Sequence, residues 1–280
     1  MTTLVHLIVV LGMVVIVPVG LRMVDDPHPL LHAARRYWPI AAAAGAASLW
    51  LPRGPVATAL ALGYALGAVL LVGYATARLL RRRSLTPIEV AVHTALLSPA
   101  VAAAALVAER AEFQLFGFKP TVLTLTVAHF HFAGFAAALI AGLIARVAGD
   151  GAVVGGRRAA DAAALTVPAG TLLVLIGYFT GDAVELAGAL VLTAGMWTVS
   201  WLTWRHGRTI AADRLTAGLL LVSAAILLAS MVLAVSWAVG EATGLPHPSL
   251  AWMAATHGVA NALGFALCAI VGWRRVGAQV

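Results

Sequence analysis

Long apolar runs separated by short polar segments fill almost the whole sequence. Breaking these runs at charged residues, Gly and Pro predicts nine helices, at residues 3–21, 37–51, 55–77, 87–108, 121–145, 162–180, 184–204, 215–240 and 250–273. The second run is short and a tight turn at Gly181-Asp182 joins the sixth and seventh, so the pattern leaves the count open by one. A bilayer core about 30 Å thick needs roughly 20 apolar residues per crossing helix. We therefore expect an all-α, polytopic transmembrane helix bundle.

Composition agrees with a chain whose solvent is lipid. Of the 280 residues, 62% are hydrophobic and only 10% are charged, values that soluble domains do not reach. The helices use nearly all of the chain, so a single transmembrane domain over residues 1–280 is expected. The one cysteine, Cys268, excludes an intrachain disulfide and a cysteine-based metal site, and packing is its expected role. The first apolar run lacks a basic leader and is followed by Arg22, which favours a retained helix.

The basic residues alternate between the two sides of the predicted bundle. With the N-terminus outside, the cytoplasmic segments hold fifteen of the 18 Lys and Arg residues: Arg22, Arg35, Arg36, Arg78, Arg81, Arg82, Arg83, Arg146, Arg157, Arg158, Arg205, Arg208, Arg214, Arg274 and Arg275. Only Arg53, Arg110 and Lys119 fall outside. This bias predicts an outside N-terminus, a cytoplasmic C-terminus and a multi-pass protein of the plasma (inner) membrane. It also explains the positive net charge without a nucleic-acid partner.

The fifth predicted helix carries two histidines at membrane depth, where ionisable groups are costly and usually face the bundle interior. At 1.5 Å per residue, His129 and His131 lie roughly 12 and 15 Å below the outer surface. Residues two apart on a helix point about 200° apart, so one metal ion is not easily held by both. They could serve two sites, or one could face a cavity while the other bonds a neighbouring helix. Packed, hydrogen-bonded histidines are the structural alternative.

The ninth predicted helix places His257 about 10 Å deep and Asn261 four residues further along the same face. This spacing suits a hydrogen-bonding site or the orientation of one imidazole, and equally a structural contact between helices. The fifth and ninth predicted helices share an internal echo: Gly134-Phe135 and Gly142 match Gly264-Phe265 and Gly272 in residue type and spacing. This alignment pairs His131 with Asn261 and would fit a parallel repeat.

Carboxylates gather near the outer ends of the predicted helices. Asp182, Glu112 and Glu241 are candidate partners of the histidines, and Glu112 and Glu241 are the two that we expect to fold inward over them. Each carboxylate could also be an ordinary solvated loop residue. We expect a site shared by His257 with His129 or His131.

Three segments together resemble the YndJ-like family of bacterial membrane proteins. They are Ala128-His129-Phe130-His131-Phe132-Ala133-Gly134-Phe135, Gly240-Glu241-Ala242-Thr243-Gly244, and Thr256-His257-Gly258 followed by Asn261-Ala262-Leu263-Gly264-Phe265. The likeness extends over most of the chain. The family is usually described as transporters without an established substrate or reaction, so the resemblance implies the fold and the polar positions rather than a chemistry.

A local resemblance links Ala128-His129-Phe130-His131 to the helix of heme–copper oxidases in which two such histidines ligate two hemes. The sequence departs from that family because it has no adjacent His-His pair and no His-Pro-Glu, which argues against oxygen reduction. A single bis-histidine heme between His131 and His257 is what this resemblance leaves open. A divalent metal is a second option, and the sequence requires neither cofactor.

Three functions are compatible with these residues. The first is a membrane-embedded enzyme in which His129 or His131, His257, Asn261 and an outer carboxylate carry out acid–base or metal-assisted cyclisation, isomerisation or hydrolysis of a small or lipophilic substrate. The second is a small-molecule or proton-coupled transporter using the same residues near mid-membrane. The third is a bis-histidine heme-binding membrane protein. Nine helices make a small bundle, so assembly into a homo-oligomer would fit a transporter.

Overall fold

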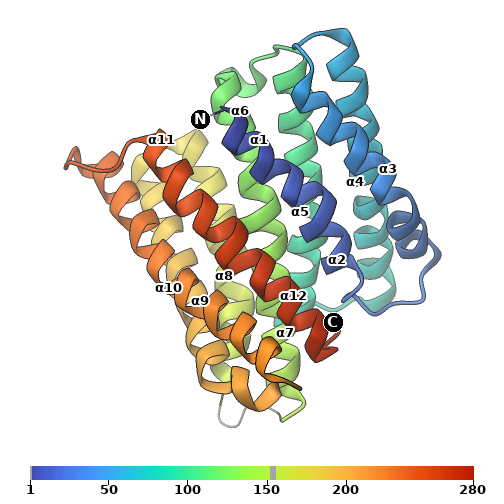
Figure 1. Ribbon diagram of the computed structural model, residues 1–280, viewed down its shortest axis with the longest axis vertical. Coiled ribbons are helices and arrows are strands. Elements are labelled where there is room, and N and C mark those ends of the chain that lie inside the picture. The colour runs from blue at the N-terminus through green and yellow to red at the C-terminus, as the bar shows by residue number, and fades with distance from the viewer. Residues whose placement is uncertain (1, 152–155) are drawn as a thin grey trace. The chain divides into compact units, whose positions relative to one another are not determined.

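The computed structural model describes residues 2–151 and 156–280, which are almost entirely helical and contain no strand (Figure 1). In chain order the segments are α1 (Thr2–Leu11), η1 (Gly12–Ile16), α2 (Val17–Leu21), α3 (Pro29–Trp50), α4 (Pro55–Arg82), α5 (Pro87–Arg110), η2 (Leu115–Gly117), α6 (Pro120–His129), η3 (Phe130–Ala136), α7 (Ala137–Gly149), α8 (Arg157–Thr180), α9 (Asp182–Ile210), α10 (Arg214–Thr243), α11 (Leu250–Met253), η4 (Ala254–Gly258), η5 (Ala260–Leu267) and α12 (Cys268–Val276). The segment η2 is a 3₁₀ turn, and η1, η3, η4 and η5 are π-helical.

The π-helical segments lie inside longer helices, so the described chain forms nine long helices, as the apolar runs predict. Eight of the described helices are long and apolar enough to cross a membrane. The exception is α3, whose second turn holds Arg35 and Arg36. The tight turn between the sixth and seventh helices is confirmed, since α8 ends at Thr180, α9 begins at Asp182, and Gly181 between them has a φ of 123°.

Prolines mark where several helices begin, because proline fixes a helical φ and lacks the amide hydrogen that the first turn leaves unbonded. The first residues of α3, α4, α5 and α6 are Pro29, Pro55, Pro87 and Pro120. At α3 the Nδ1 atom of His28 also accepts a hydrogen bond of 3.2 Å from the amide of Leu30. This cap explains why α3 begins before residue 37, where the apolar run alone placed the start.

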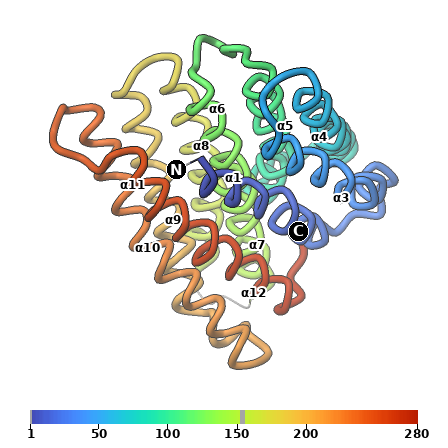
Figure 2. Tube along the Cα trace, turned by 45° about the horizontal axis from the view of Figure 1, so that its top comes forward, coloured from blue at the N-terminus to red at the C-terminus, as the bar shows by residue number. Residues whose placement is uncertain are grey.

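Contacts between Cα atoms divide the described chain into two compact units. The amino-terminal unit comprises Thr2–Ser84 with His93–Ala136, and the carboxy-terminal unit comprises Leu85–Val92 with Ala137–Val280. In the first unit α3 and α4 pack side by side, as Figure 2 shows. In the second unit α9 packs against both α8 and α10.

Small residues bring α8 and α9 into unusually close contact in the carboxy-terminal unit. A Cβ atom added at Gly170 would lie 2.4 Å from the backbone nitrogen of Leu192, and one added at Gly188 would lie 2.4 Å from that of Val174. No real Cβ atom tolerates such distances, so the glycines allow the two backbones to touch. Packing of this kind replaces the hydrophobic effect as the force that holds helices together in lipid.

One face of α4 is buried along its whole length in the amino-terminal unit. Its buried residues are Ala57, Ala61, Tyr64, Gly67, Ala68, Leu71, Tyr74, Ala75 and Arg78. The spacing of three and four residues is that of one helix face. Unlike an ordinary apolar face, this one contains two tyrosines and an arginine, and each of the three is fully buried.

Candidate functional site

A histidine–tyrosine pair lies at the centre of the buried α4 face. The hydroxyl of Tyr64 is 2.8 Å from Nε2 of His131, and Nδ1 of His131 is 2.6 Å from the carbonyl oxygen of Val127. A carbonyl can only accept, so Nδ1 carries the hydrogen and Nε2 of the neutral ring accepts the hydrogen bond that Tyr64 donates. Both side chains have no exposed surface. We call this arrangement the Tyr64–His131 pair.

Two π-helical segments surround this pair. His131 lies in η3, and Gly12, the first residue of η1, is so close that a Cβ atom added there would lie 2.7 Å from Cβ of His131. In η1 the carbonyl of Met13 accepts a hydrogen bond of 2.8 Å from Nε1 of Trp38. Trp38 in turn contacts Tyr64 edge to face, with ring centroids 5.5 Å apart. Wide π turns inside α-helices often occur at functional sites.

His129 is the last residue of α6 and has different surroundings from His131. It is half-buried, and its ring meets that of Phe130 at a centroid distance of 6.2 Å. Among the described residues, no group of three or more His, Cys, Asp or Glu side chains is arranged to hold a metal ion.

The pairing of His257 with Asn261 is confirmed, and Ser230 of α10 completes it. Nδ1 of His257 lies 2.9 Å from the carbonyl oxygen of Ser230, and Nε2 lies 3.0 Å from the amide nitrogen of Asn261. The hydroxyl of Ser230 donates a hydrogen bond of 2.9 Å to Oδ1 of Asn261. By the same argument as for His131, the carbonyl fixes the hydrogen on Nδ1 and leaves the lone pair on Nε2. The side chains of His257 and Asn261 are half-buried.

The carboxylates expected over the histidines are at the surface instead. Glu112 is exposed and has a φ of 56°, because it lies in the turn that follows α5. Glu241 is also exposed, and its Oε1 atom lies 3.3 Å from Nε2 of His247, a residue of the next loop. Asp182 is exposed in the first turn of α9, where a negative charge stabilises the positive end of the helix dipole. The expected inward fold of Glu112 and Glu241 is therefore wrong for both side chains.

The echo between the fifth and ninth helices extends to their conformation. Gly134-Phe135 lies in η3 and Gly264-Phe265 lies in η5, so each Gly-Phe pair is in a π-helical segment followed by an α-helix. His131 and His257 belong to different units, and the shared site expected for them stays a prediction.

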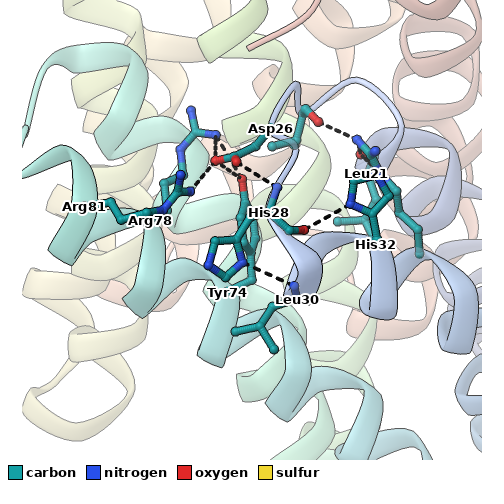
Figure 3. Close-up of polar contacts among 10 residues, drawn as sticks. Leu21, Asp26, His28, Leu30, His32, Tyr74, Arg78 and Arg81 are labelled. Atoms are coloured by element: carbon teal, nitrogen blue, oxygen red, sulfur yellow. Dashed lines mark hydrogen bonds and ion pairs between the residues drawn. The ribbon is translucent and has the colours of Figure 1, made fainter.

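A buried acidic residue that the sequence gave little reason to select is Asp26. Its Oδ2 atom accepts hydrogen bonds of 3.0 Å from the hydroxyl of Tyr74 and 2.6 Å from Arg81, and Arg78 lies 3.7 Å away (Figure 3). Nη1 of Arg78 also donates to the Tyr74 hydroxyl, at 3.1 Å. The backbone amide of His28 donates to Oδ1 of Asp26 at 3.1 Å. We call Asp26, Tyr74, Arg78 and Arg81 the Asp26 cluster.

These partners keep the Asp26 carboxylate charged although it is buried. Burial raises the pKa of Asp26, but the hydrogen bonds from Arg81 and Tyr74 and the positive charge of Arg81 outweigh burial and hold this pKa below its usual value. The loop that carries Asp26 is itself fixed, since Arg35 donates to the carbonyl oxygens of Leu21 and Val24.

A second buried carboxylate lies at the other end of α4. Arg53, two residues before α4, donates to Oε1 of Glu109 from Nε at 2.9 Å, and Arg110 donates to both oxygens of Glu109. Nη1 of Arg110 donates to the carbonyl oxygen of Ser48 at 3.1 Å. We call Glu109, Arg53 and Arg110 the Glu109 cluster. His6 packs close by, with its ring edge to face against Trp50 at 5.7 Å.

Sequence reasoning missed Tyr64 and both buried carboxylates for an identifiable reason. Tyr64 has an apolar ring and gave no signal as a polar residue within a run, and Asp26 and Glu109 lie at helix ends, where charge is ordinary. A signal existed in the spacing of α4: Tyr64, Tyr74 and Arg78 recur on the face occupied by small and apolar residues.

Heme ligation by His131 has a specific obstacle in this geometry. Both ring nitrogens are occupied, Nδ1 by the carbonyl of Val127 and Nε2 by the hydroxyl of Tyr64. A heme iron bound at Nε2 would have to displace the hydroxyl of Tyr64, which is fully buried. The residues present therefore fit a heme poorly, and no step below depends on one.

Helices that cross a membrane and buried polar groups between them define the class of this chain: it is a multi-pass, all-helical membrane protein. Within that class the chain belongs to the YndJ-like protein family, whose pattern it matches over residues 7–265. The family resemblance of the three sequence segments is thereby confirmed. No curated protein and no solved structure matches the chain.

Proposed function

We propose that the chain is a proton-coupled carrier of a small solute in the plasma membrane. The observation that carries the proposal is the Tyr64–His131 pair, a neutral imidazole hydrogen-bonded to a hydroxyl with no exposed surface on either group. Ionisable side chains at membrane depth are expensive and mark proton relays and substrate paths. A neutral imidazole has one ring nitrogen that can bind and release a proton.

The pair supports a defined proton step. A proton arriving at Nε2 of His131 turns the ring into a cation, and Nε2 then donates to Tyr64 where it had accepted. The hydroxyl of Tyr64 must rotate, so its hydrogen becomes free to bond another group. Protonation is thereby coupled to a change of hydrogen bonding on the α4 face, and a carrier needs proton binding to be coupled to a change of this kind.

Charges at both ends of α4 favour transport over catalysis. The Asp26 cluster lies at the end of α4 that contains Arg81, and the Glu109 cluster lies at the end that follows Arg53. Between them, α4 has 28 residues, a length of about 42 Å that spans a bilayer. A buried proton acceptor between two buried charge clusters suits a path across the membrane, whereas an enzyme needs its groups at one reacting atom.

Transport is tested with purified protein in liposomes that contain a pH-sensitive dye. We expect an inward proton gradient to drive solute uptake, with internal acidification that depends on the solute. Tyr64→Phe and His131→Gln should reduce this coupled flux at least tenfold. Tyr37→Phe is the matched control, since Tyr37 is half exposed. Solute accumulation without internal acidification, unchanged in Tyr64→Phe, would contradict the proton coupling.

The proposed orientation, with the N-terminus outside and the C-terminus cytoplasmic, can be tested with the one native cysteine removed. In a Cys268→Ser background, Lys119→Cys is expected to react with a membrane-impermeant thiol reagent added to whole cells. Leu85→Cys, an exposed position on the opposite side of the predicted topology, should react only after the cells are broken. The reverse labelling pattern would overturn the orientation.

A membrane-embedded acid–base enzyme is the second candidate, and the His257, Asn261 and Ser230 arrangement favours it. The carbonyl of Ser230 orients a half-buried imidazole and leaves the lone pair on Nε2, which is how proteins position a general base. A small or lipophilic substrate would have to displace the amide of Asn261 to reach Nε2. A chemically new product that the wild-type protein forms and a His257→Gln variant does not would favour this function.

A further inference from the structure

The Glu109 cluster leaves one side of the Arg53 guanidinium unused. Nε and Nη2 of Arg53 lie 2.9 and 2.8 Å from Oε1 of Glu109, and these two nitrogens share one edge of the planar group. The side that carries Nη1 faces away from this carboxylate. The side chain of Arg53 is 40% exposed, whereas those of Glu109 and Arg110 are 1% and 4% exposed. The accessible part of the cluster is therefore a guanidinium edge with hydrogens to donate.

Positive charge exceeds negative charge within this cluster. Nε and Nη2 of Arg110 donate to the two oxygens of Glu109, and Nη1 donates to the carbonyl oxygens of Ser48 and Leu51, which carry no net charge. Both guanidinium groups of the cluster stay protonated at any physiological pH, so two positive charges meet one negative charge. His6, which lies beside them, can only be neutral or positive. The cluster therefore favours an anion as ligand and disfavours a cation.

The neighbouring charged residues do not change this balance. Glu112 lies in the turn that follows α5 and Lys119 lies directly before α6, and both residues are exposed. Their charges are opposite, and water and salt screen both of them. The unpaired positive charge therefore stays with Arg53, which is the accessible one of the two arginines in the cluster.

The end of α5 holds Arg53 in a fixed position. The amide of Gly54 donates to the carbonyl oxygen of Arg110 at 3.0 Å, and the Arg110 side chain binds the carbonyl oxygens of Ser48 and Leu51 on the other side of the loop. Gly54 has a φ of 135°, a conformation that favours glycine. A donor that is already in place loses little conformational entropy when a ligand binds. The loop is thus organised before any ligand arrives.

The cluster also lies at the level of a membrane boundary. It is found where α4 begins and α5 ends, and both helices are long and apolar enough to cross a bilayer. Trp50, the last residue of α3, is 52% exposed, and its ring meets that of His6 edge to face. Tryptophans of membrane proteins concentrate at the level of the lipid headgroups. The anion that is always present at this level is the phosphate group of a phospholipid.

We propose that the Glu109 cluster is a binding site for the headgroup of an anionic phospholipid. The unused edge of Arg53 donates to two oxygens of the phosphate, because the fork of a guanidinium matches the geometry of this group. Glu109 and Arg110 position Arg53, and the ring of Trp50 lies at the level of the glycerol. One net negative charge on the lipid balances the unpaired positive charge, which a zwitterionic lipid cannot do. This site is independent of the proposed transport function.

Lipid binding is measured by native mass spectrometry of the full-length protein in detergent, with added phosphatidylglycerol or phosphatidylcholine. We expect the protein to retain phosphatidylglycerol under conditions that remove phosphatidylcholine. Arg53→Gln should weaken phosphatidylglycerol binding about tenfold or more, the loss expected for charge-assisted hydrogen bonds, and leave phosphatidylcholine binding unchanged. Lys119→Gln is the matched control, since it removes an exposed positive charge from the segment that follows α5 and should change binding by less than about twofold.

Arg53→Lys keeps a positive partner for the buried Glu109, so the test does not depend on whether Arg53→Gln folds. Lysine cannot form the fork, and we expect Arg53→Lys to lose about threefold or more in phosphatidylglycerol affinity. Equal affinity for the two lipids, or equal losses in Arg53→Gln and Lys119→Gln, would overturn the site, because surface charge alone would then explain binding. Displacement of phosphatidylglycerol by an equal concentration of inorganic phosphate would overturn the lipid assignment, because the ligand would then be a soluble phosphate.

Discussion

Removal of a single hydroxyl group isolates the contribution of the Tyr64–His131 pair. Tyr64→Phe keeps the ring that contacts Trp38 and deletes only the donor that lies 2.8 Å from Nε2 of His131. Because both side chains are fully buried, Nε2 is left without a donor in surroundings that offer no bulk water. An unsatisfied buried polar atom costs about 1–3 kcal/mol. We expect the free energy of unfolding to fall by about 2 kcal/mol.

The measurement is reversible unfolding of the purified protein in mixed micelles at increasing denaturing detergent. Tyr37→Phe, which deletes a hydroxyl from a half-exposed ring, should change the free energy of unfolding by less than about 0.5 kcal/mol. Adding His131→Leu to wild type and to Tyr64→Phe completes a double-mutant cycle. We expect a coupling energy of at least about 1 kcal/mol between Tyr64 and His131. A Tyr64→Phe protein as stable as wild type, with no coupling to His131, would refute the reasoning.

Three further outcomes are expected from other parts of the chain. Gly170→Ala should lower the free energy of unfolding by about 1–3 kcal/mol, because its Cβ would lie 2.4 Å from the backbone nitrogen of Leu192. Gly218→Ala is the control, because a Cβ at Gly218 would meet nothing within 4 Å. In the same detergent unfolding assay it should leave the free energy of unfolding unchanged or raise it by up to about 1 kcal/mol. The folded pKa of Asp26 is held below its unfolded value, so the stability that the Asp26 carboxylate contributes is fully present above about pH 4 and is lost as pH falls from there through the folded pKa. The difference between wild type and Asp26→Asn should therefore shrink progressively in unfolding curves measured at decreasing pH below about 4. Asn261→Ala removes the donor to Nε2 of a half-buried histidine and should cost about 1 kcal/mol, and an unchanged unfolding midpoint would contradict the hydrogen bond assigned there.

Periodicity and charge were sufficient to predict most of the fold. Apolar runs of about 20 residues can satisfy their backbone groups in lipid only as helices, so the helices and the tight turn at Gly181 follow directly from the pattern. The helix ends were predicted less well, because residues such as Arg35 and Arg82 extend helices beyond the apolar part of the run. Length in these helices is decided by capping and proline, not by hydropathy alone.

The candidate site was predicted only where its residues were neighbours on one helix. The spacing of His257 and Asn261 fixes their contact whatever the rest of the chain does, and this pair was found. The bond between Tyr64 and His131 joins residues that are 67 positions apart, and no local pattern specifies it. For the same reason Glu112 was selected and Glu109 was not. The two lie three residues apart near the same helix end, and no local pattern shows that Glu109 meets Arg53.

The π-helical segments change how related sequences should be aligned. A bond from residue i to i+5 fits one more residue into a turn than an α-helix does, so each such turn amounts to a one-residue insertion within a helix. Deleting one residue between Phe130 and Ala136 would let an ordinary α-helix form while the helices on either side keep their faces. The same deletion in a plain α-helix would rotate everything after it by about 100°. Comparisons within the family should therefore permit single-residue gaps inside the fifth helix. A helical wheel drawn without a break through His131 would assign the residues of α7 to the wrong face.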